Sequence, residues 1–181
     1  MTVRNADLRS LANCKELNSV SDPAAVREVD LSFNKIDSCA GLAKFANITD
    51  LVLDNNSFST LKTLPAFTNL HVLSLSNNSL RDLDGALAAI CSGCPSIQHL
   101  NLIGNPANPM FSNPNKYEEF RAKIKIWLPS LETLDGTDFT KDSATIAKNM
   151  NAIEQLKAKV MAKHTPPQGG QLATIPEKGS G

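Results

Sequence analysis

The sequence has few aromatic residues, no excess of charge and no long apolar run. Aromatic residues make up 5% of the 181 residues, which leaves little material for stacking against nucleic-acid bases. The 18 Lys and Arg residues are balanced by 18 Asp and Glu residues, so no overall field attracts a polyanion. No run approaches the roughly 18 apolar residues that a membrane-spanning helix needs. These absences argue against direct nucleic-acid binding and against a membrane span.

The N-terminal segment also lacks the apolar core of a secretory signal. Arg4, Asp7 and Arg9 fall where such a core would lie. We therefore expect a cytoplasmic protein, with a nuclear or ciliary location as the alternatives, in which the cysteines remain free thiols.

The chain offers little for a metal site or a catalytic centre. Cys91 and Cys94 have the spacing of a zinc knuckle, but no second pair of ligands completes the site. His71 and His99 occupy comparable positions, and Asp50 is the only third ligand near them. We find neither a phosphate-binding glycine loop nor a nucleophile elbow. We expect no metal, no cofactor and no enzymatic activity.

What the sequence does contain is an internal repeat. Four segments align without gaps on the pattern L-x-x-L-x-L-x-x-N-x-L, in which L stands for an apolar residue. Their asparagines follow one another at intervals of 22, 22 and 27 residues, which is the range of leucine-rich repeats. The pattern predicts an α/β solenoid with a parallel, concave sheet of about five strands and short helices or turns on the convex side. The segments are 26–36, 48–58, 70–80 and 97–107.

The apolar residues and asparagines of the pattern follow from the path of the backbone in each turn of the solenoid. In the second repeat, Leu51 and Leu53 are two positions apart on a strand, so both side chains point into the interior. The chain then turns inward and leaves backbone donors and acceptors buried, and an asparagine side chain can satisfy both kinds of group. We therefore predict that the repeated asparagines form a structural ladder and are not binding residues. They are Asn34, Asn56, Asn78 and Asn105.

The segments between the repeats return along the convex side. Residues 39–47 and 84–94 have the pattern of helices, and the second is longer because its repeat has 27 residues. Residues 60–69 contain Pro65, which favours a turn or a short 3₁₀ segment. We expect two helices and one turn on this side.

Both ends of a solenoid must be covered, because the outermost repeats expose apolar faces. Leu8, Leu11 and Leu17 approximate helical spacing, which predicts a capping helix within residues 1–19, ahead of the repeats at 20–112.

At the other end, residues 113–140 predict a second cap. One apolar stripe indicates a helix that Pro129 ends. Leu131 and Leu134 then supply a fifth strand before the Asp-Gly pair at 135–136 turns the chain. The stripe consists of Tyr117, Phe120, Ile124 and Trp127 with Leu128.

Beyond the cap, residues 141–163 predict an amphipathic helix, because apolar residues recur there at intervals of 4, 3, 3 and 4. This stripe either packs on the end of the solenoid or docks to a partner. Residues 164–181 are rich in Pro, Gly and Ser, and we expect them to be disordered.

The C-terminal part resembles the cap of a known class of leucine-rich proteins. Gly-Asn-Pro at 104–106 is followed by Tyr-x-x-Phe-Arg at 117–121 and Leu-Pro-x-Leu-x-x-Leu-Asp-Gly at 128–136. This order is similar to that of intracellular leucine-rich-repeat proteins of the 22-residue class, among them the U2 spliceosomal A-prime protein and the leucine-rich axonemal dynein light chain. In residues 99–135 the chain is most similar to the leucine-rich melanocyte differentiation-associated protein and its relatives. The resemblance covers about residues 20–140 and implies the solenoid fold and a protein partner.

We expect binding on the concave face, where outward strand residues alternate with buried ones. Five strands about 4.8 Å apart give a face about 19 Å across, enough for one helix about 10–12 Å in diameter or for an extended peptide. Acidic residues lie toward the edges and apolar ones nearer the middle, which favours a partner with an apolar anchor flanked by basic residues. The predicted partner-binding residues are Arg27, Glu28, Asp30, Asp50, Val52, Asp54, His71, Val72, Ser74, His99, Asn101 and Ile103.

These features predict a non-enzymatic adaptor for protein-protein interaction that is a monomer by itself. The resemblance leaves two alternatives, a ribonucleoprotein-associated subunit and an axonemal or motor-associated subunit. Nuclear location and association with small nuclear RNA would indicate the first, and presence in cilia would indicate the second.

Overall fold

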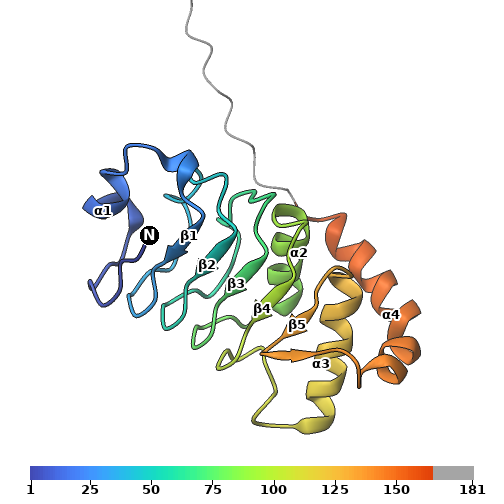
Figure 1. Ribbon diagram of the computed structural model, residues 1–181. Coiled ribbons are helices and arrows are strands. Elements are labelled where there is room, and N and C mark those ends of the chain that lie inside the picture. The colour runs from blue at the N-terminus through green and yellow to red at the C-terminus, as the bar shows by residue number, and fades with distance from the viewer. Residues whose placement is uncertain (165–181) are drawn as a thin grey trace, which may run out of the picture.

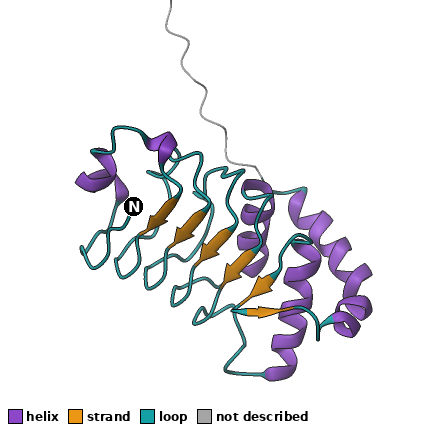
Figure 2. Ribbon diagram, viewed as in Figure 1, coloured by secondary structure: helices purple, strands orange, loops and turns teal. Residues whose placement is uncertain are grey.

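Five short parallel strands lie side by side in the order of the chain, and a sixth strand closes the sheet (Figure 1). The computed structural model describes residues 1–164. The chain winds as a solenoid, with the sheet on one side and turns and helices on the other (Figure 2). This arrangement confirms the predicted α/β solenoid. The strands are β1 (Glu28–Asp30), β2 (Asp50–Val52), β3 (Val72–Ser74), β4 (His99–Asn101), β5 (Thr133–Leu134) and β6 (Thr137–Asp138).

A file of buried apolar residues runs through the middle of the sheet. Val29, Leu51, Leu73 and Leu100 are register partners on β1 to β4, and Leu134 continues the file on β5. None of the five is more than 2% exposed. Because side chains alternate along a strand, this file fixes the register and directs the neighbouring side chains to the opposite face.

The asparagine ladder joins each repeat to the one before it. Nδ2 of Asn78 donates to the carbonyl oxygens of Leu53 and Leu75 at 3.0 Å, and its Oδ1 accepts from the Phe58 amide at 3.0 Å. The other three repeated asparagines make the same contacts in their own repeats. The prediction of a structural role is therefore confirmed.

The return segment of the first repeat is a series of turns, so the helix predicted over 39–47 is wrong. The amides of Leu42, Phe45 and Ile48 each donate to the carbonyl three residues earlier, and all three side chains are buried. A 22-residue repeat leaves too few residues here for an α-helix, which advances only about 1.5 Å per residue. Turns cover the same path with fewer residues.

The third repeat has five more residues, and its return segment holds α2 (Leu83–Gly93), as the sequence predicts for 84–94. Asp82 caps this helix by accepting a hydrogen bond from the Gly85 amide. The second return segment, 60–69, consists of turns, as predicted.

Residues 1–8 form an incomplete repeat where the sequence predicted a capping helix. Thr2 pairs with Asp30 as a parallel bridge, and the Leu8 amide donates to Oδ1 of Asn34, the contact made by the ladder elsewhere. Residues 1–8 are extended because β1 would otherwise be an unpaired edge, and only extended chain can pair with it. Of the predicted range 1–19, only residues 11–13 and 15–18 are helical. Three short elements follow: η1 (Leu11–Asn13), α1 (Lys15–Asn18) and η2 (Pro23–Ala25).

A tight hairpin ends the parallel part of the sheet. Asp135 and Gly136 have φ values of 54° and 79°, as a two-residue hairpin turn requires. The chain reverses into β6, antiparallel to β5, a strand that the sequence did not predict. Oδ1 of Asp135 accepts from the Leu102 amide at 2.8 Å, in place of the carbonyl that a continued strand would supply. The Leu-Asp-Gly motif therefore ends the repeats without leaving that buried donor unpaired.

Helix α3 (Pro114–Trp127) covers the last repeat. Asn113 caps it by accepting from the amide three residues later, and Pro114 occupies the first position, where no amide hydrogen is needed. Phe120, Ile124 and Trp127 are at most 5% exposed, so the predicted stripe faces the core.

Helix α4 (Ser143–Met161) lies against α3, within the region where the sequence predicts an amphipathic helix (Figure 1). Ile146, Ile153 and Val160 pack against the core, although no residue of α4 is fully buried. These three members of its apolar stripe therefore rest on the end of the solenoid, whereas Leu156 is exposed.

The predicted disordered tail, 164–181, lies outside the described residues except for His164. Among the residues that the structure describes, no helix is both long and apolar enough to cross a membrane.

Candidate protein-binding surface

Two rows of outward-facing side chains cross the sheet on the face opposite the buried file. The pairing of the strands places the members of each row next to one another, so the register itself builds the surface. In Figures 1 and 2, helices α2, α3 and α4 lie away from this face, behind the strands or beyond β5. The first row is Glu28, Asp50, Val72, His99 and Thr133, and the second is Asp30, Val52, Ser74 and Asn101.

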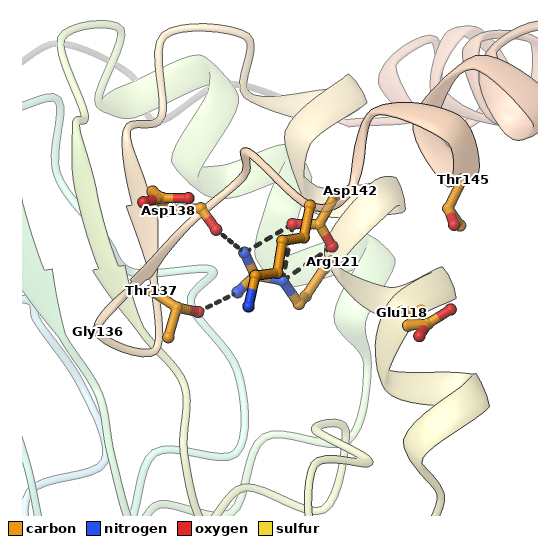
Figure 3. Close-up of a pocket in the computed structure, with 8 residues that line it drawn as sticks. Glu118, Arg121, Gly136, Thr137, Asp138, Asp142 and Thr145 are labelled. Carbon is orange, nitrogen blue, oxygen red and sulfur yellow. Dashed lines mark hydrogen bonds and ion pairs between the residues drawn. The ribbon is translucent and has the colours of Figure 1, made fainter.

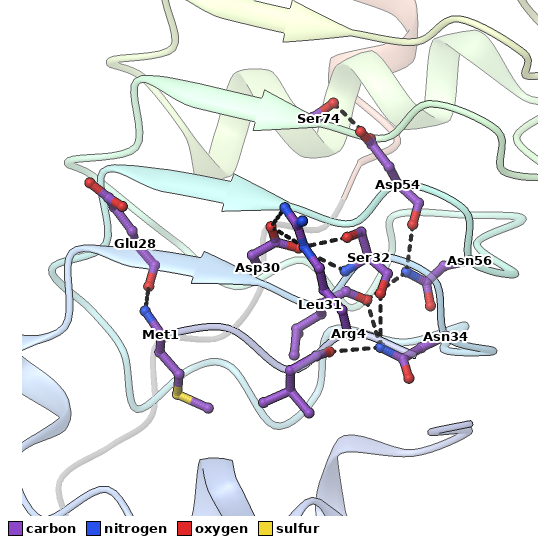
Figure 4. Close-up of polar contacts among 11 residues, drawn as sticks. Met1, Arg4, Glu28, Asp30, Leu31, Ser32, Asn34, Asp54, Asn56 and Ser74 are labelled. Carbon is purple, nitrogen blue, oxygen red and sulfur yellow. Dashed lines mark hydrogen bonds and ion pairs between the residues drawn. The ribbon is translucent and has the colours of Figure 1, made fainter. Parts of the chain in front are cut away.

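The Asp30 carboxylate is already engaged by the protein (Figure 4). Arg4 forms an ion pair with it and donates through Nε at 2.8 Å, and the Ser32 hydroxyl donates at 2.8 Å. Partial burial opposes ionisation, but the hydrogen bonds from Arg4 and Ser32 outweigh it and lower the pKa of Asp30. Part of the negative charge predicted for this face is therefore neutralised.

Asp54 also makes structural hydrogen bonds on this face. Its Oδ1 accepts from the Ser74 hydroxyl at 2.7 Å and from the Ser76 amide at 2.8 Å, which links the second repeat to the third. Within the described part of the chain, Asp50 accepts a hydrogen bond only from the neighbouring Thr49 hydroxyl, at 2.6 Å, and the Glu28 side chain is exposed. Glu28 and Asp50 are thus the carboxylates best placed to meet a basic partner.

Three further predicted residues border the rows. Arg27 turns its guanidinium back toward η2, where Nη1 donates to the Ala24 carbonyl at 2.7 Å. His71 is half-buried one position before β3, and Ile103 is half-buried two positions after β4. All three lie at strand ends, at the margin of the surface.

The surface is hollowed over β3, β4 and β5. A depression of about 260 Å³ lies there, with the turn at Gly136 on its border. Nδ1 of His99 and Oγ1 of Thr133 are hydrogen-bonded at 2.9 Å, and Oδ1 of Asn101 accepts from the backbone amide two residues later. The hollow joins one apolar wall to several uncharged polar groups. Its lining is Val72, Leu73, Ser74, His99, Leu100, Asn101, Thr133 and Gly136.

The side chains of this surface form no metal site among the described residues, and Cys39 and Cys94 are buried in the core. Within residues 1–164, no three His, Cys, Asp or Glu side chains gather as ligands for a metal ion. The Cys39 and Cys94 thiols are buried, and burial raises the pKa of each to about 12, so neither is an available nucleophile. Carboxylate, hydroxyl, amide and imidazole groups interspersed with valines are suited to contact with another protein.

A second polar cluster lies in the C-terminal cap and is structural (Figure 3). Arg121 and Asp142 form an ion pair in which the side chains are 7% and 8% exposed. Arg121 also donates to Oγ1 of Thr137 at 2.6 Å and to the carbonyl oxygens of Leu134 and Asp138. An open hollow of about 520 Å³ borders the cluster, but the protein itself occupies the guanidinium donors. This pair binds α3 to the hairpin and to the start of α4.

Sequence reasoning missed Arg4 and the Arg121–Asp142 pair. For Arg4 a signal exists, since Val3 and Leu8 have the five-residue spacing of the last two apolar positions of each repeat. The sequence contains no signal for the Arg121–Asp142 ion pair, because the two residues are 21 positions apart and only the fold brings them together.

Comparison with known proteins supports the fold. The family model for leucine-rich repeats (two copies) matches residues 68–113. The human leucine-rich melanocyte differentiation-associated protein is 31% identical over 109 residues, which cover 58% of this chain and 55% of that protein. The chain therefore matches only about half the length of this curated relative.

A similar solved structure is a chain in the crystal structure of the Drosophila melanogaster SNF/U2A' complex. It matches with a TM-score of 0.63 and 20% sequence identity, over 90% of this chain and 86% of that one. At this identity the likeness shows the fold alone. Together with the four in-register repeats and their asparagine ladder, these matches show that the chain has a leucine-rich-repeat fold.

Proposed function

We propose that this protein is a non-enzymatic adaptor that binds a helix or an extended peptide of a partner protein on the concave sheet face and acts as a monomer. The observation that carries the proposal is the pair of in-register rows on a sheet face away from the helices. Leucine-rich-repeat solenoids present such extended concave surfaces because each repeat adds one strand to them.

The side chains on this face set the chemistry of the partner. Val52 and Val72 are half-buried and lie on adjacent strands, so an apolar group of the partner can remove them from water. Asp50 is the register partner of Val72, Glu28 is the register partner of Asp50, and both complement positive charge. The partner would therefore carry an apolar anchor with basic residues near it.

The decisive experiment changes one outward residue and its inward neighbour. Val72→Glu puts a charge on the exposed face, so partner capture from cell extract should be lost while the urea midpoint stays nearly unchanged. Leu73→Glu buries a charge in the core and should unfold the protein. Lys62→Glu on the convex side is the matched surface control. Normal capture by Val72→Glu, together with loss in Lys62→Glu, would place the binding face elsewhere.

A ribonucleoprotein-associated role is the second candidate, and the likeness to a chain of the SNF/U2A' complex favours it. It predicts a nuclear protein that co-precipitates with small nuclear RNA through a protein partner. Cell fractionation combined with sequencing of the co-precipitated RNA distinguishes it from a cytoplasmic adaptor. A cytoplasmic protein without enriched RNA would exclude this candidate.

A further inference from the structure

We propose that the concave face binds one amphipathic helix in a fixed direction, with an aromatic side chain in the hollow over β3–β5 and a basic side chain over the carboxylates of β1 and β2. The inference rests on the proposed function and adds to it the form, the chemistry and the orientation of the partner segment.

The shape of the face favours a helix as the bound segment of the partner. Strands β1 to β4 are three residues long, about 10 Å at 3.3 Å per residue, and the rows extend about 19 Å across five strands. A helix about 10–12 Å wide and about 13 residues long covers this area when it lies across the strands. An extended peptide would find the strand backbones already paired with one another, whereas a helix satisfies its own backbone groups.

The size and lining of the hollow favour an aromatic side chain of the partner. Its volume of about 260 Å³ gives room for one large side chain. Val72 supplies an apolar wall, while Ser74, Asn101 and Thr133 supply uncharged polar groups. A tyrosine matches this combination, because its ring is apolar and its hydroxyl both donates and accepts.

The distribution of carboxylates gives the direction. None lines the hollow, and the carboxylates that adjoin it are engaged by the protein. Asp54 accepts from the Ser74 hydroxyl at 2.7 Å, Asp135 from the Leu102 amide at 2.8 Å and Glu132 from the Gln98 side-chain amide at 3.1 Å. Glu28 and Asp50 lie on the first two strands, and there a lysine or arginine of the partner gains charge complementarity. A helix bound in the reverse direction would place its cation over the hollow, which no carboxylate lines.

The strand spacing predicts how far apart the two anchors lie in the sequence of the partner helix. Asp50 on β2 and His99 on β4 are two strands apart, which is about 10 Å. Seven residues of α-helix span about 10.5 Å and return to nearly the same face. The partner helix should therefore carry its aromatic and basic anchors seven residues apart.

The test is a selection of phage-displayed random 16-residue peptides on the immobilised full-length protein. The expected consensus has an aromatic residue and a Lys or Arg seven positions apart, in one order only. A synthetic peptide with this consensus should become helical on binding, as measured by circular dichroism. Its affinity should fall about tenfold or more when 0.5 M salt replaces 0.05 M salt, because the charge contact is screened.

Two variants test the two anchors separately. Val72→Trp fills the hollow and should weaken peptide binding at least tenfold, whereas Ala46→Trp, at an exposed convex position, should not. Glu28→Lys combined with Asp50→Lys should lose the basic peptide and bind a version in which Glu replaces its Lys or Arg. Thermal melting of each variant confirms that it is folded.

The outcomes separate this inference from the proposed function. Peptides that are sensitive to Val72→Trp but lack the basic anchor, or carry both anchors in either order, overturn the fixed direction and leave concave binding intact. Peptides that bind Val72→Trp and the charge-reversed variant as well as the parent protein overturn both. A selection that yields no binding peptide counts against both as well.

Discussion

The two ends of this solenoid cover their outermost repeats in different ways. At the N-terminal end, residues 1–8 imitate a repeat, and the amides of Val3 and Asp30 exchange hydrogen bonds with the facing strand at 2.8 and 2.9 Å. The ion pairs there, Arg4–Asp30 and Lys35–Asp7, include side chains that are more than half exposed. The C-terminal end replaces the repeat by two helices and a hairpin around a buried ion pair.

This difference predicts how readily each end unfolds locally. An imitated repeat adds backbone hydrogen bonds and little buried apolar area, so it can separate from β1 without disturbing the rest. The cap buries Trp127 completely and joins segments that are distant in the chain, so its loss exposes the core of the last repeat. We expect the N-terminal end to open first and the cap to open only with global unfolding.

Among the changes that compare the two ends, the largest effect should come from Arg121→Met in the cap. The change leaves the Asp142 carboxylate buried without a partner, which costs about 3–5 kcal/mol of unfolding free energy. Urea denaturation followed by tryptophan fluorescence measures the loss. Adding Asp142→Asn to the same chain should recover part of it, since no buried charge remains. A loss below about 1 kcal/mol would mean that the cap does not depend on this pair.

The asparagine ladder allows the two regions to be compared with one substitution. Asn78→Ala in the middle of the solenoid leaves several buried backbone groups unpaired and should cost about 3 kcal/mol. Asn34→Ala breaks contacts to Val3 and Leu8 of the imitated repeat, where water can replace them once that segment separates. Its cost in urea unfolding should therefore be smaller. Equal losses would show that residues 1–8 are as firmly attached as an internal repeat.

Phe33→Asn should stabilise the protein by about 1 kcal/mol, because it relieves a left-handed backbone conformation. Phe33 has φ +57° and is 53% exposed, and the corresponding residues of the next two repeats, Asn55 and Asn77, are of a type that tolerates this conformation. Phe111→Asn is the control, since that side chain is 80% exposed without a positive φ. Equal shifts in melting temperature for both variants would assign the effect to surface hydrophobicity alone.

Arg4→Ala should have the smallest effect, because the Arg4 side chain is 53% exposed and water and salt screen its pair with Asp30. The pKa of Asp30 is lowered in the folded protein, so the pair contributes above the ordinary carboxyl pKa and its contribution is lost as pH falls through the folded value. Urea midpoints at pH 7 and pH 3 should differ slightly less for Arg4→Ala than for the parent protein. A larger difference in the variant would contradict the sign of the pKa shift.

The candidate surface was predictable as a set of positions but not as a distribution of charge. The alternation around Leu51 and Leu73 places Asp50, Val52 and Val72 on the outward face, and the register confirms that they are neighbours. Whether a carboxylate is free depends on contacts across the repeats. Asp30 is neutralised by a residue 26 positions earlier, which no local pattern reveals.

The repeat pattern by itself determined the solenoid, the buried file and the asparagine ladder, because each repeat meets the same steric and hydrogen-bonding demands as its neighbour. Only the tertiary structure decided the pairing of residues 1–8 with β1, the buried Arg121–Asp142 pair and the hollow. Residues 1–8 are extended because β1 offers an edge to pair with, and the hollow exists because the hairpin at Gly136 borders strands β3 to β5. These features depend on the segments that adjoin the repeats, and the pattern of one repeat does not specify which other segment packs against it.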